Sequence, residues 1–255
     1  MKTITERHQF ILQKLKESGS VTIQELSDWM EVSGVTIRKD LKLLEDKSLL
    51  FRTRGGGSMT NPYAFEKPID EKALIQAEEK QKIAKAALTL IGQTDSILIS
   101  SGTTVFELAR CLNPAQRLTV ITPAVKVATE LSNRANVEVL QLGGLLRPNS
   151  SSVVGSYAER MLENLSCGML FVGVDGIDFD FGLSISNLTE TSLNQKMIDA
   201  AQTVVVLADS SKFGKRGIGR IGTLDQIHYL ITDAGVSAET VQQLEERGVK
   251  VIVAG

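Results

Sequence analysis

The sequence is poor in the residues that build metal sites and disulfide frameworks. Its 255 residues include two cysteines, Cys111 and Cys167, and two histidines, His8 and His228. Two cysteines cannot form a disulfide framework or a four-ligand zinc site, and because both stand next to apolar runs we expect buried thiols. Two histidines exclude a His-rich metal site and disfavour a Ser-His-Asp triad. We therefore expect no metal, no cofactor and no catalytic residue.

Long apolar runs and a strong charge imbalance are also absent. No run reaches the roughly 18 apolar residues of a membrane span, and the start, "MKTITERHQF", lacks the apolar stretch of a signal peptide. We therefore expect a cytoplasmic protein without a membrane partner. The net charge of −2 does not indicate a nucleic-acid binder, although residues 1–60 hold ten Lys and Arg against eight Asp and Glu. A DNA-binding hypothesis must rest on where these basic residues stand.

The first sixty residues contain three short helical patterns with start signals. The first, "ERHQFILQKLKES", ends at Gly19. Thr22 and Glu25 then have the spacing of a capping box, which predicts the start of a second helix. After a short turn, Ser33 can cap a third helix by accepting a hydrogen bond from a backbone N–H near Thr36.

The third helical pattern separates an apolar face from a basic face. Ile37, Leu41 and Leu44 recur at i, i+4 and i+7 and predict a buried stripe. The next stretch, "SLLFRTRGGGSM", predicts a short hairpin or wing with two outward arginines. This order is a winged helix-turn-helix, whose third helix enters the major groove of double-stranded DNA. The candidate DNA-binding residues are Ser33, Val35, Thr36, Arg38, Lys39, Lys42, Arg52 and Arg54.

A small helical lid with a solvated charged face is the alternative interpretation of this region, and the capped second helix and the basic wing disfavour it. Residues 21–57 resemble the DNA-binding module of DeoR-family bacterial transcriptional regulators, through "VSGVTIRKDLKLLE" and "RTRGGG". Lys39 stands where that family usually has a second Arg, and "RTRGGG" replaces a more common His-Gly-Gly-Ala wing end. Lysine keeps the charge but loses the bidentate fork of arginine. We expect a changed operator preference with DNA binding retained.

The composition changes after residue 58, where Gly, Ser and Pro precede a charged stretch. We predict a winged helix-turn-helix domain at 1–58, a linker at 59–77, and an effector-binding and oligomerisation domain at 78–255. From about residue 95, apolar runs such as "SILIS" and "MLFVGV" alternate with helical patterns. Such runs are typical of parallel strands covered on both faces. The sequence therefore predicts a larger α/β domain with a mostly parallel sheet.

Polar motifs follow three of the predicted strands, where ligands bind in such sheets. In "SSGTT", 100–104, Gly102 allows close backbone approach and the helix start favours an anion. "GVDGID", 173–178, supplies Asp175 and Asp178, and "DSSKFGK", 209–215, supplies Lys212. Each motif alone has a plain interpretation: a helix cap, a turn aspartate or a solvated lysine. Together they favour one pocket for a phosphorylated sugar.

The order of these motifs is similar to that in the effector domain of DeoR-family regulators, which resembles ribose-5-phosphate isomerase. This resemblance implies a phosphorylated sugar or sugar-derived effector. Two departures stand out: Ser100 replaces an acidic residue, and Pro123 and Ala124 replace the family's Asn-Ser. Both remove polar contacts from the expected pocket. The resemblance assigns the phosphate loop to Ser101, Gly102, Thr103 and Thr104, and the remaining pocket positions to Gly143, Gly144, Asp175, Gly176, Asp178, Glu190 and Lys212.

The resemblance favours a DNA-binding regulator, a repressor of a carbohydrate-metabolism operon whose operator binding is modulated by that effector. One winged helix-turn-helix reads a half-site, so we expect a homo-oligomer, either a dimer or a tetramer. The alternative is a sugar-phosphate isomerase-like enzyme with an appended DNA-binding module, for which Asp175, Asp178 or Glu190 could supply a base. A pure protein-interaction module does not explain Arg38 together with the two wing arginines.

Overall fold

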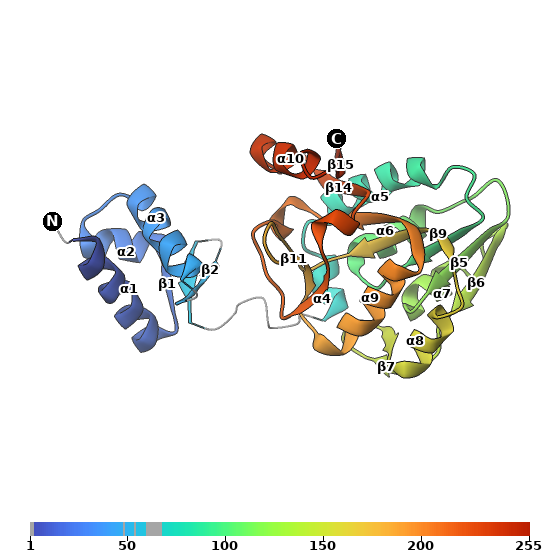
Figure 1. Ribbon diagram of the computed structural model, residues 1–255, viewed down its shortest axis with the longest axis horizontal. Coiled ribbons are helices and arrows are strands. Elements are labelled where there is room, and N and C mark those ends of the chain that lie inside the picture. The colour runs from blue at the N-terminus through green and yellow to red at the C-terminus, as the bar shows by residue number, and fades with distance from the viewer. Residues whose placement is uncertain (1–2, 48, 54, 60–67) are drawn as a thin grey trace. The chain divides into compact units, whose positions relative to one another are not determined.

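The computed structural model describes residues 3–47, 49–53, 55–59 and 68–255. The chain divides into two compact units, Met1–Phe65 and Glu66–Gly255 (Figure 1). Part of the range predicted as a linker, 69–77, is ordered in the second unit, because it forms one short helix and begins the next. Within the described residues no helix is long and apolar enough to cross a membrane.

The first unit is the predicted winged helix-turn-helix. Its three strands form an antiparallel sheet in the order β1-β3-β2, with β3 in the middle. The predicted stripe of the third helix is buried in the core of this unit. The elements are α1 (Ile4–Ser18), β1 (Ser20–Thr22), α2 (Ile23–Met30), α3 (Gly34–Asp46), β2 (Phe51–Thr53) and β3 (Gly56–Ser58).

Both predicted helix starts are confirmed by side-chain hydrogen bonds. Thr22 Oγ1 accepts from the backbone N–H of Glu25 at 3.1 Å, and the Glu25 carboxylate accepts from the N–H of Thr22 at 2.8 Å. Ser33 Oγ accepts from the N–H of Thr36 at 3.3 Å. Each cap satisfies amides that a helix start leaves without a partner. The caps thereby fix where α2 and α3 begin, and with it the tight turn between them.

The second unit is built on a seven-stranded sheet in which all neighbouring strands are parallel, in the order β15-β14-β12-β9-β4-β5-β6. The predicted α/β domain is confirmed. The sheet strands are β4 (Ser96–Ile99), β5 (Leu118–Thr122), β6 (Val137–Gln141), β9 (Cys167–Gly173), β12 (Ala201–Leu207), β14 (Tyr229–Asp233) and β15 (Lys250–Ala254). The helices are α4 (Ile69–Ala73), α5 (Ala77–Ile91), α6 (Thr103–Cys111), α7 (Val125–Leu131), α8 (Ser156–Leu162), α9 (Thr191–Asp199) and α10 (Ala238–Glu245).

Two smaller sheets and three short 3-10 helices complete the second unit. The first sheet joins β10 (Gly176–Asp178), β11 (Gly182–Ile185) and β13 (Gly219–Gly222), and the second pairs β7 (Leu145–Arg147) with β8 (Ser152–Val154). The 3-10 helices are η1 (Leu188–Glu190), η2 (Ser210–Lys212) and η3 (Leu224–Gln226).

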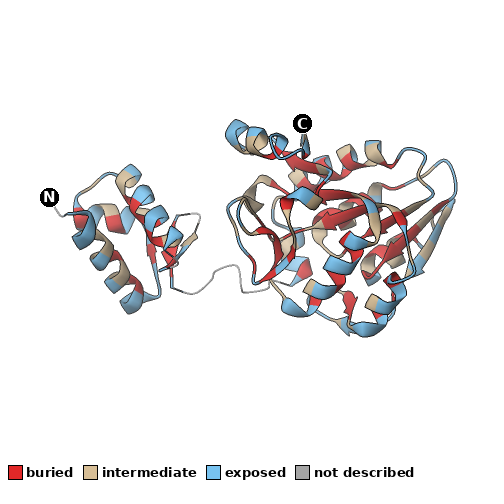
Figure 2. Cartoon of the chain, in the orientation of Figure 1, coloured by how far each residue is buried: buried red, intermediate tan, exposed pale blue. Residues whose placement is uncertain are grey.

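Both faces of the central strands of the large sheet are covered, which explains why these strands are mostly apolar (Figure 2). In β4, Ile97 and Ile99 belong to the core with α5, α6 and α7. Leu98 between them belongs to the core with α8, α9 and α10. Successive side chains of a strand point to opposite faces, so a strand covered on both sides must be apolar at every position.

The strand order reverses at the centre of the sheet. From β4 the chain continues to β5 and β6 on one side, and then returns to place β9, β12, β14 and β15 on the other. The loops that follow β4 and β9 therefore lead away from each other, which opens a crevice at the carboxyl ends of these two strands. Ser100 Oγ accepts from the N–H of Gly173 at 3.1 Å and joins the two strand ends.

Candidate DNA-binding face and effector pocket

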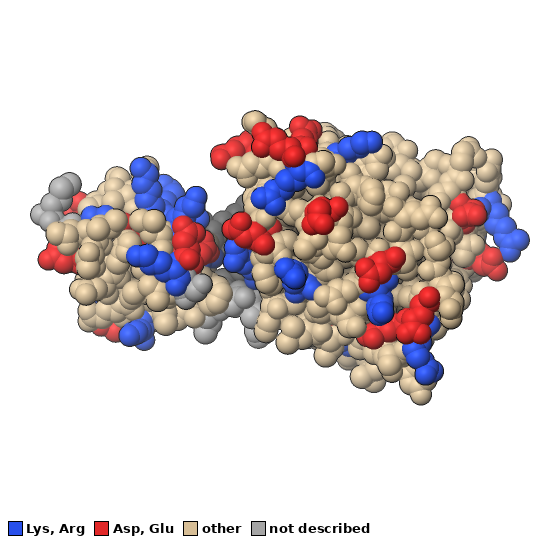
Figure 3. Space-filling model, in the orientation of Figure 1, with Lys and Arg blue, Asp and Glu red and all other residues tan. Residues whose placement is uncertain are grey.

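The outward side of α3 is a basic surface. Arg38, Lys39 and Lys42 are exposed, and Val35 is 59% exposed, whereas Ile37 is fully buried on the opposite side. Figure 3 shows Lys and Arg side chains over the part of the first unit where α3 lies. The side chains predicted to contact DNA along this helix therefore share one face.

Of the two wing arginines, Arg52 lies within the described residues and Arg54 does not. The backbone N–H of Arg52 donates to Glu45 Oε1 at 3.0 Å, and its guanidinium lies 3.8 Å from Glu45 Oε2. Arg52 is therefore held beside the last turn of α3, with its side chain 40% exposed. Arg54 lies outside the described residues, and its DNA contact stays a prediction.

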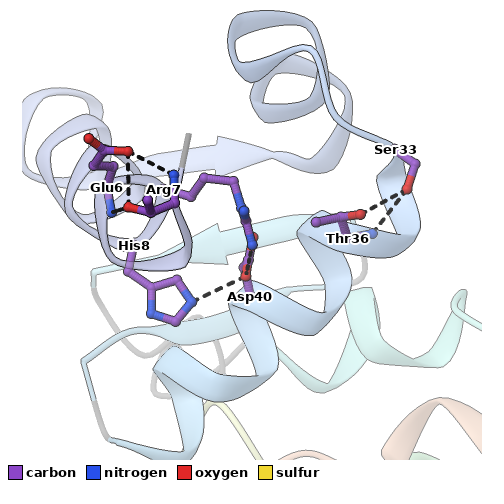
Figure 4. A network of polar contacts seen from close by, with 7 residues as sticks. Glu6, Arg7, His8, Ser33, Thr36 and Asp40 are labelled. Carbon is purple, nitrogen blue, oxygen red and sulfur yellow. Dashed lines mark hydrogen bonds and ion pairs between the residues drawn. The ribbon is translucent and has the colours of Figure 1, made fainter. Parts of the chain in front are cut away.

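Asp40 is a buried charge on α3 that sequence reasoning missed (Figure 4). Its side chain is 2% exposed, and its carboxylate accepts from Arg7 Nε at 2.7 Å and from Arg7 Nη2 at 3.0 Å. His8 Nε2 lies 3.2 Å from the same carboxylate. This ion pair fastens α1 to α3. One signal was present, because Asp40 stands three residues after Ile37 and four before Leu44, within the apolar stripe.

The second unit holds a cavity, partly open to solvent, at the carboxyl ends of β4 and β9. Seven of the predicted effector-site residues line it: Ser101, Gly102, Thr103, Thr104, Asp175, Glu190 and Lys212. Sequence reasoning missed other polar lining residues: Lys72, Lys80, Asn149, Ser150, Asn187, Asn194 and Asp209.

The loop after β4 opens α6 toward this cavity. Gly102 adopts φ 139° and ψ 160°, a backbone conformation that residues other than glycine rarely adopt. No side chain among the described residues caps α6. The first amides of α6 therefore remain available beside the cavity, where Thr103 and Thr104 line it. A helix start of this kind binds anions through its N–H groups and its dipole.

Acidic groups of the cavity are paired with cations. Lys72 Nζ lies 2.9 Å from Asp175 Oδ1, and Arg147 Nη1 lies 2.6 Å from Glu190 Oε1. Burial raises the pKa of Asp175, but the charge and hydrogen bond of Lys72, together with the N–H of Ser186 and the charge of Lys212, outweigh it and hold that pKa below its ordinary value. Lys212 makes no side-chain hydrogen bond or ion pair within the part of the chain that the structure describes. Its ammonium group is thus free to meet a ligand.

Lys80, in the first turn of α5, is the most buried cation of the cavity. It is 4% exposed, and its Nζ donates to the carbonyl oxygen of Lys72 at 2.5 Å. Burial lowers the pKa of Lys80 to about 8, and the nearby Asp209 opposes this effect only in part. In the sequence "EEKQKIAK" it looks like one charge of a solvated face. Its position three residues before Ile83 places it on the buried side of α5.

Four of the predicted effector residues lie elsewhere. Gly143 and Gly144 line a separate hollow beside α8. Gly176 packs against a neighbouring backbone, since a Cβ there would lie 2.3 Å from the carbonyl oxygen of Lys215. Asp178 accepts from the N–H groups of Asp180 and Phe181 and pairs with Arg216 at 2.8 Å, which closes the β10–β11 turn.

The three residues that depart from the family pattern in the expected pocket, Ser100, Pro123 and Ala124, also lie outside the residues that line the cavity. Ser100 joins the ends of β4 and β9 through the hydrogen bond to Gly173. Ala124 donates its N–H to Thr122 Oγ1 at 3.1 Å, and the carbonyl of Pro123 accepts from Val153. These residues therefore hold strand ends in place.

Comparison with known proteins agrees with both units. The model of the DeoR-like helix-turn-helix domain matches residues 7–62, and that of the DeoR C terminal sensor domain matches residues 75–234. The candidate aga operon transcriptional repressor of Escherichia coli O157:H7 is 37% identical over 254 residues, which cover 98% of this chain and 94% of that one. The transcriptional repressor GlcR of Bacillus subtilis (strain 168) is 32% identical over 248 residues, covering 97% and 95%. Ribose-5-phosphate isomerase A of Neisseria gonorrhoeae superposes with a TM-score of 0.39 and 16% identity over 55% of each chain.

The two family matches fall on the two units in the order in which the structure has them. The first covers the winged helix-turn-helix with its basic α3 face, and the second covers the α/β unit with its cavity. The relatives extend over nearly the whole chain. The chain belongs to the DeoR family of transcriptional regulators.

Proposed function

We propose that the protein represses a carbohydrate-metabolism operon by binding double-stranded operator DNA, and that a phosphorylated sugar in the cavity modulates this binding. The observation that carries the proposal is the exposed basic face of α3 on a winged helix-turn-helix. The relatives named above are repressors, which supports repression as the outcome.

An isomerase with an appended DNA-binding module is not favoured. The curated relatives over the whole chain are transcriptional regulators. The carboxylates that could supply a base are also engaged in pairs: Asp175 with Lys72, Glu190 with Arg147, and Asp178 with Arg216. The protein is a regulator and not an enzyme.

In this proposal α3 lies in the major groove. Its N-terminal residues meet base edges, and the apolar Val35 contacts a thymine methyl group. Lys39 and Lys42 neutralise phosphates, as do Arg52 and Arg54 of the wing. Ser33 and Thr36 stand at the helix start, where backbone amides can also bind a phosphate.

Replacing Arg38 with alanine is expected to lower specific operator affinity by about 1–3 kcal/mol, because a bidentate base contact is worth that much. Operator fragments selected on the wild-type protein would be used for fluorescence anisotropy at matched salt. Lys16→Ala is the control, since Lys16 is an exposed cation in the last turn of α1. If both variants lost the same operator affinity, the effect would be one of net charge alone, and a base contact by Arg38 would be contradicted.

For the effector, we propose that the phosphate lies at the start of α6, where the loop 101–104 offers N–H groups and Lys212 a point charge. Asp175, Glu190 and the asparagines of the cavity then meet the sugar hydroxyls. Gly143, Gly144, Gly176 and Asp178, which lie away from the cavity, take no part in this binding in our proposal.

Lys212→Ala is expected to leave the melting temperature of the free protein near that of the wild type, because no contact of its ammonium group is lost. The same change should remove the stabilisation by ligand, which in the wild type is about 2.7 kcal/mol at 100 times Kd. Operator binding should then become insensitive to the sugar. A panel of phosphorylated sugars and their unphosphorylated counterparts tests this by thermal shift. Stabilisation of the wild type by unphosphorylated sugars alone would contradict the phosphate site.

We also propose that the protein acts as a homo-oligomer, because one DNA-binding unit reads only a half-site. The second unit supplies exposed apolar side chains for such an assembly, among them Leu145 (74% exposed) and Tyr157 (70% exposed). Sedimentation equilibrium would separate a dimer from a tetramer. As a partner of operator DNA, the protein is expected in the cytoplasm.

A further inference from the structure

Lys80 is a charged side chain that the fold places inside the effector cavity. It is 4% exposed and lines the cavity from the first turn of α5. A buried ammonium group is costly unless it is paired. Among the described residues its ammonium group makes one hydrogen bond, to the carbonyl oxygen of Lys72 at 2.5 Å, which uses one of its three donors. Two donors remain for a ligand in the cavity.

The charges around the cavity favour an anion as that ligand. Asp175 is paired with Lys72, and Glu190 with Arg147. The third acidic residue that lines the cavity is Asp209. It is buried, and its carboxylate accepts from the N–H of Ser211 at 3.0 Å. Lys80 and Lys212 together face this single carboxylate. A ligand with a negative charge would balance the second of these two positive charges.

Lys80 also connects the cavity to α4, the first helix of the second unit. Its hydrogen bond is made to a carbonyl in the last turn of α4, where a cation is favourable. Two more contacts hold this helix: the N–H of Ile69 donates to the carbonyl of Asn149 at 2.9 Å, and Lys126 pairs with Asp70. Helix α4 is also the first helix of the second unit, which begins at Glu66.

We propose that Lys80 binds the anionic group of the effector while keeping its hydrogen bond to Lys72, so that an occupied cavity fastens helix α4. This inference rests on the proposed effector site and adds to it a residue and a route of regulation. The ligand class is a phosphate monoester, whose oxygens can accept from Lys80, from Lys212 and from the amides at the start of α6. Lys72, already paired with Asp175, adds its positive charge on the α4 side.

The first test uses inorganic phosphate as the probe and the full chain as the protein. Lys80→Met keeps the length of the side chain and removes its charge, and we expect it to raise the phosphate Kd at least tenfold in a thermal-shift titration. Lys82→Met is the matched control, because Lys82 is an exposed cation on the same helix. Its Kd should stay within twofold of the wild type. Unchanged binding in Lys80→Met, or equal weakening in both variants, would overturn the proposal.

A second measurement needs only the wild-type protein. Above about pH 8 inorganic phosphate is mainly the dianion and its charge changes little, whereas Lys80, with a pKa of about 8, loses its proton as the pH rises further. Phosphate affinity should therefore fall about tenfold per pH unit above pH 8. The groups that face Lys80 are Lys72 on α4, Glu107 on α6, Asp175 after β9, Glu190 on η1, and Asp209 and Lys212 at η2. An affinity that stays constant from about pH 8 to about pH 9.5 would exclude Lys80 as a ligand.

The connection to α4 is tested by hydrogen exchange of the amides in 69–75. Phosphate should slow this exchange in the wild type and in Lys82→Met, while in Lys80→Met only the start of α6 should be slowed. Equal slowing of α4 in Lys80→Met would overturn the connection. If phosphorylated sugars control operator binding equally in wild type and Lys80→Met, this inference fails and the proposed function stands. If phosphate binds through Lys80 but no phosphorylated sugar changes operator binding, the effector role fails and the site stands.

Discussion

Replacing Gly56 with alanine is expected to separate β3 from β1 and to abolish operator binding, whereas Gly55→Ala leaves both intact. Gly56 pairs with Thr22 of β1 and with Thr53 of β2 in the middle of the small sheet. A Cβ at Gly56 would lie 1.8 Å from the carbonyl oxygen of Val21 and 2.8 Å from the Cα of Thr22. These are backbone atoms, which cannot turn aside as a side chain can. We expect the free energy of unfolding of the first unit to fall by about 3 kcal/mol or more, which is at the upper end of the range for overpacked substitutions.

The adjacent glycine provides the control, because a Cβ at Gly55 would meet nothing within 4 Å. The chain has a single tryptophan, Trp29 on α2, which packs edge-on against Phe10 with ring centroids 6.2 Å apart. Its fluorescence therefore follows unfolding of the first unit within the full chain. Urea titration of both variants, followed by operator binding, measures the difference. A wild-type midpoint for Gly56→Ala would mean that β3 does not pair with β1 in this register.

Removing the carboxylate of Asp40 is expected to destabilise the first unit by about 1.5–3 kcal/mol, because Arg7 loses two hydrogen bonds to a charged acceptor. The Arg7 side chain is 14% exposed and donates twice to Asp40, so both of these hydrogen bonds between α1 and α3 are lost in the variant. Asp40→Ala in a urea titration followed by Trp29 fluorescence measures the loss. Asp46→Ala is the control, because Asp46 is exposed at the end of the same helix.

A double-mutant cycle separates the ion pair from other effects of the substitution. If Asp40 and Arg7 act together, Arg7→Ala combined with Asp40→Ala should cost less than the two single changes added. Additive losses, or a loss below about 1 kcal/mol for Asp40→Ala, would show that α1 and α3 are held together by their apolar contacts alone.

The features that could be predicted from the sequence depend on neighbours along the chain. The capping box at Thr22 and the cap at Ser33 involve residues three positions apart, and the stripe of α3 follows from helical periodicity. The strands of the large sheet were predictable for the same reason, since a run covered on both faces is apolar throughout. Strand order was not, because β9 pairs with β4 across a long stretch of sequence.

The site residues also divide into those that could be predicted from their neighbours along the chain and those that depend on distant residues. The loop 101–104 and Lys212 follow strands directly, so the rule that ligands bind at strand ends places them in the cavity. Gly143 and Gly176 were assigned through the order of family motifs, and order along the chain does not tell which way a turn faces. Asp178 was assigned with Asp175 from the motif after β9, but its side chain binds within the β10–β11 turn. Lys72 and Lys80 were missed because their partners are distant or are backbone atoms. Asp175, the partner of Lys72, is 103 positions away.

The central place of β4 in the large sheet has a consequence for synthesis on the ribosome. Its neighbour β5 follows within the next two dozen residues, but its other neighbour, β9, begins only at Cys167. At about 5–20 residues per second, the first unit is complete well before β9 emerges, while β4 waits with one edge unpaired. An open edge of an apolar strand invites pairing with other chains. Products that end before Cys167 are therefore expected to carry a finished helix-turn-helix on a second unit that aggregates.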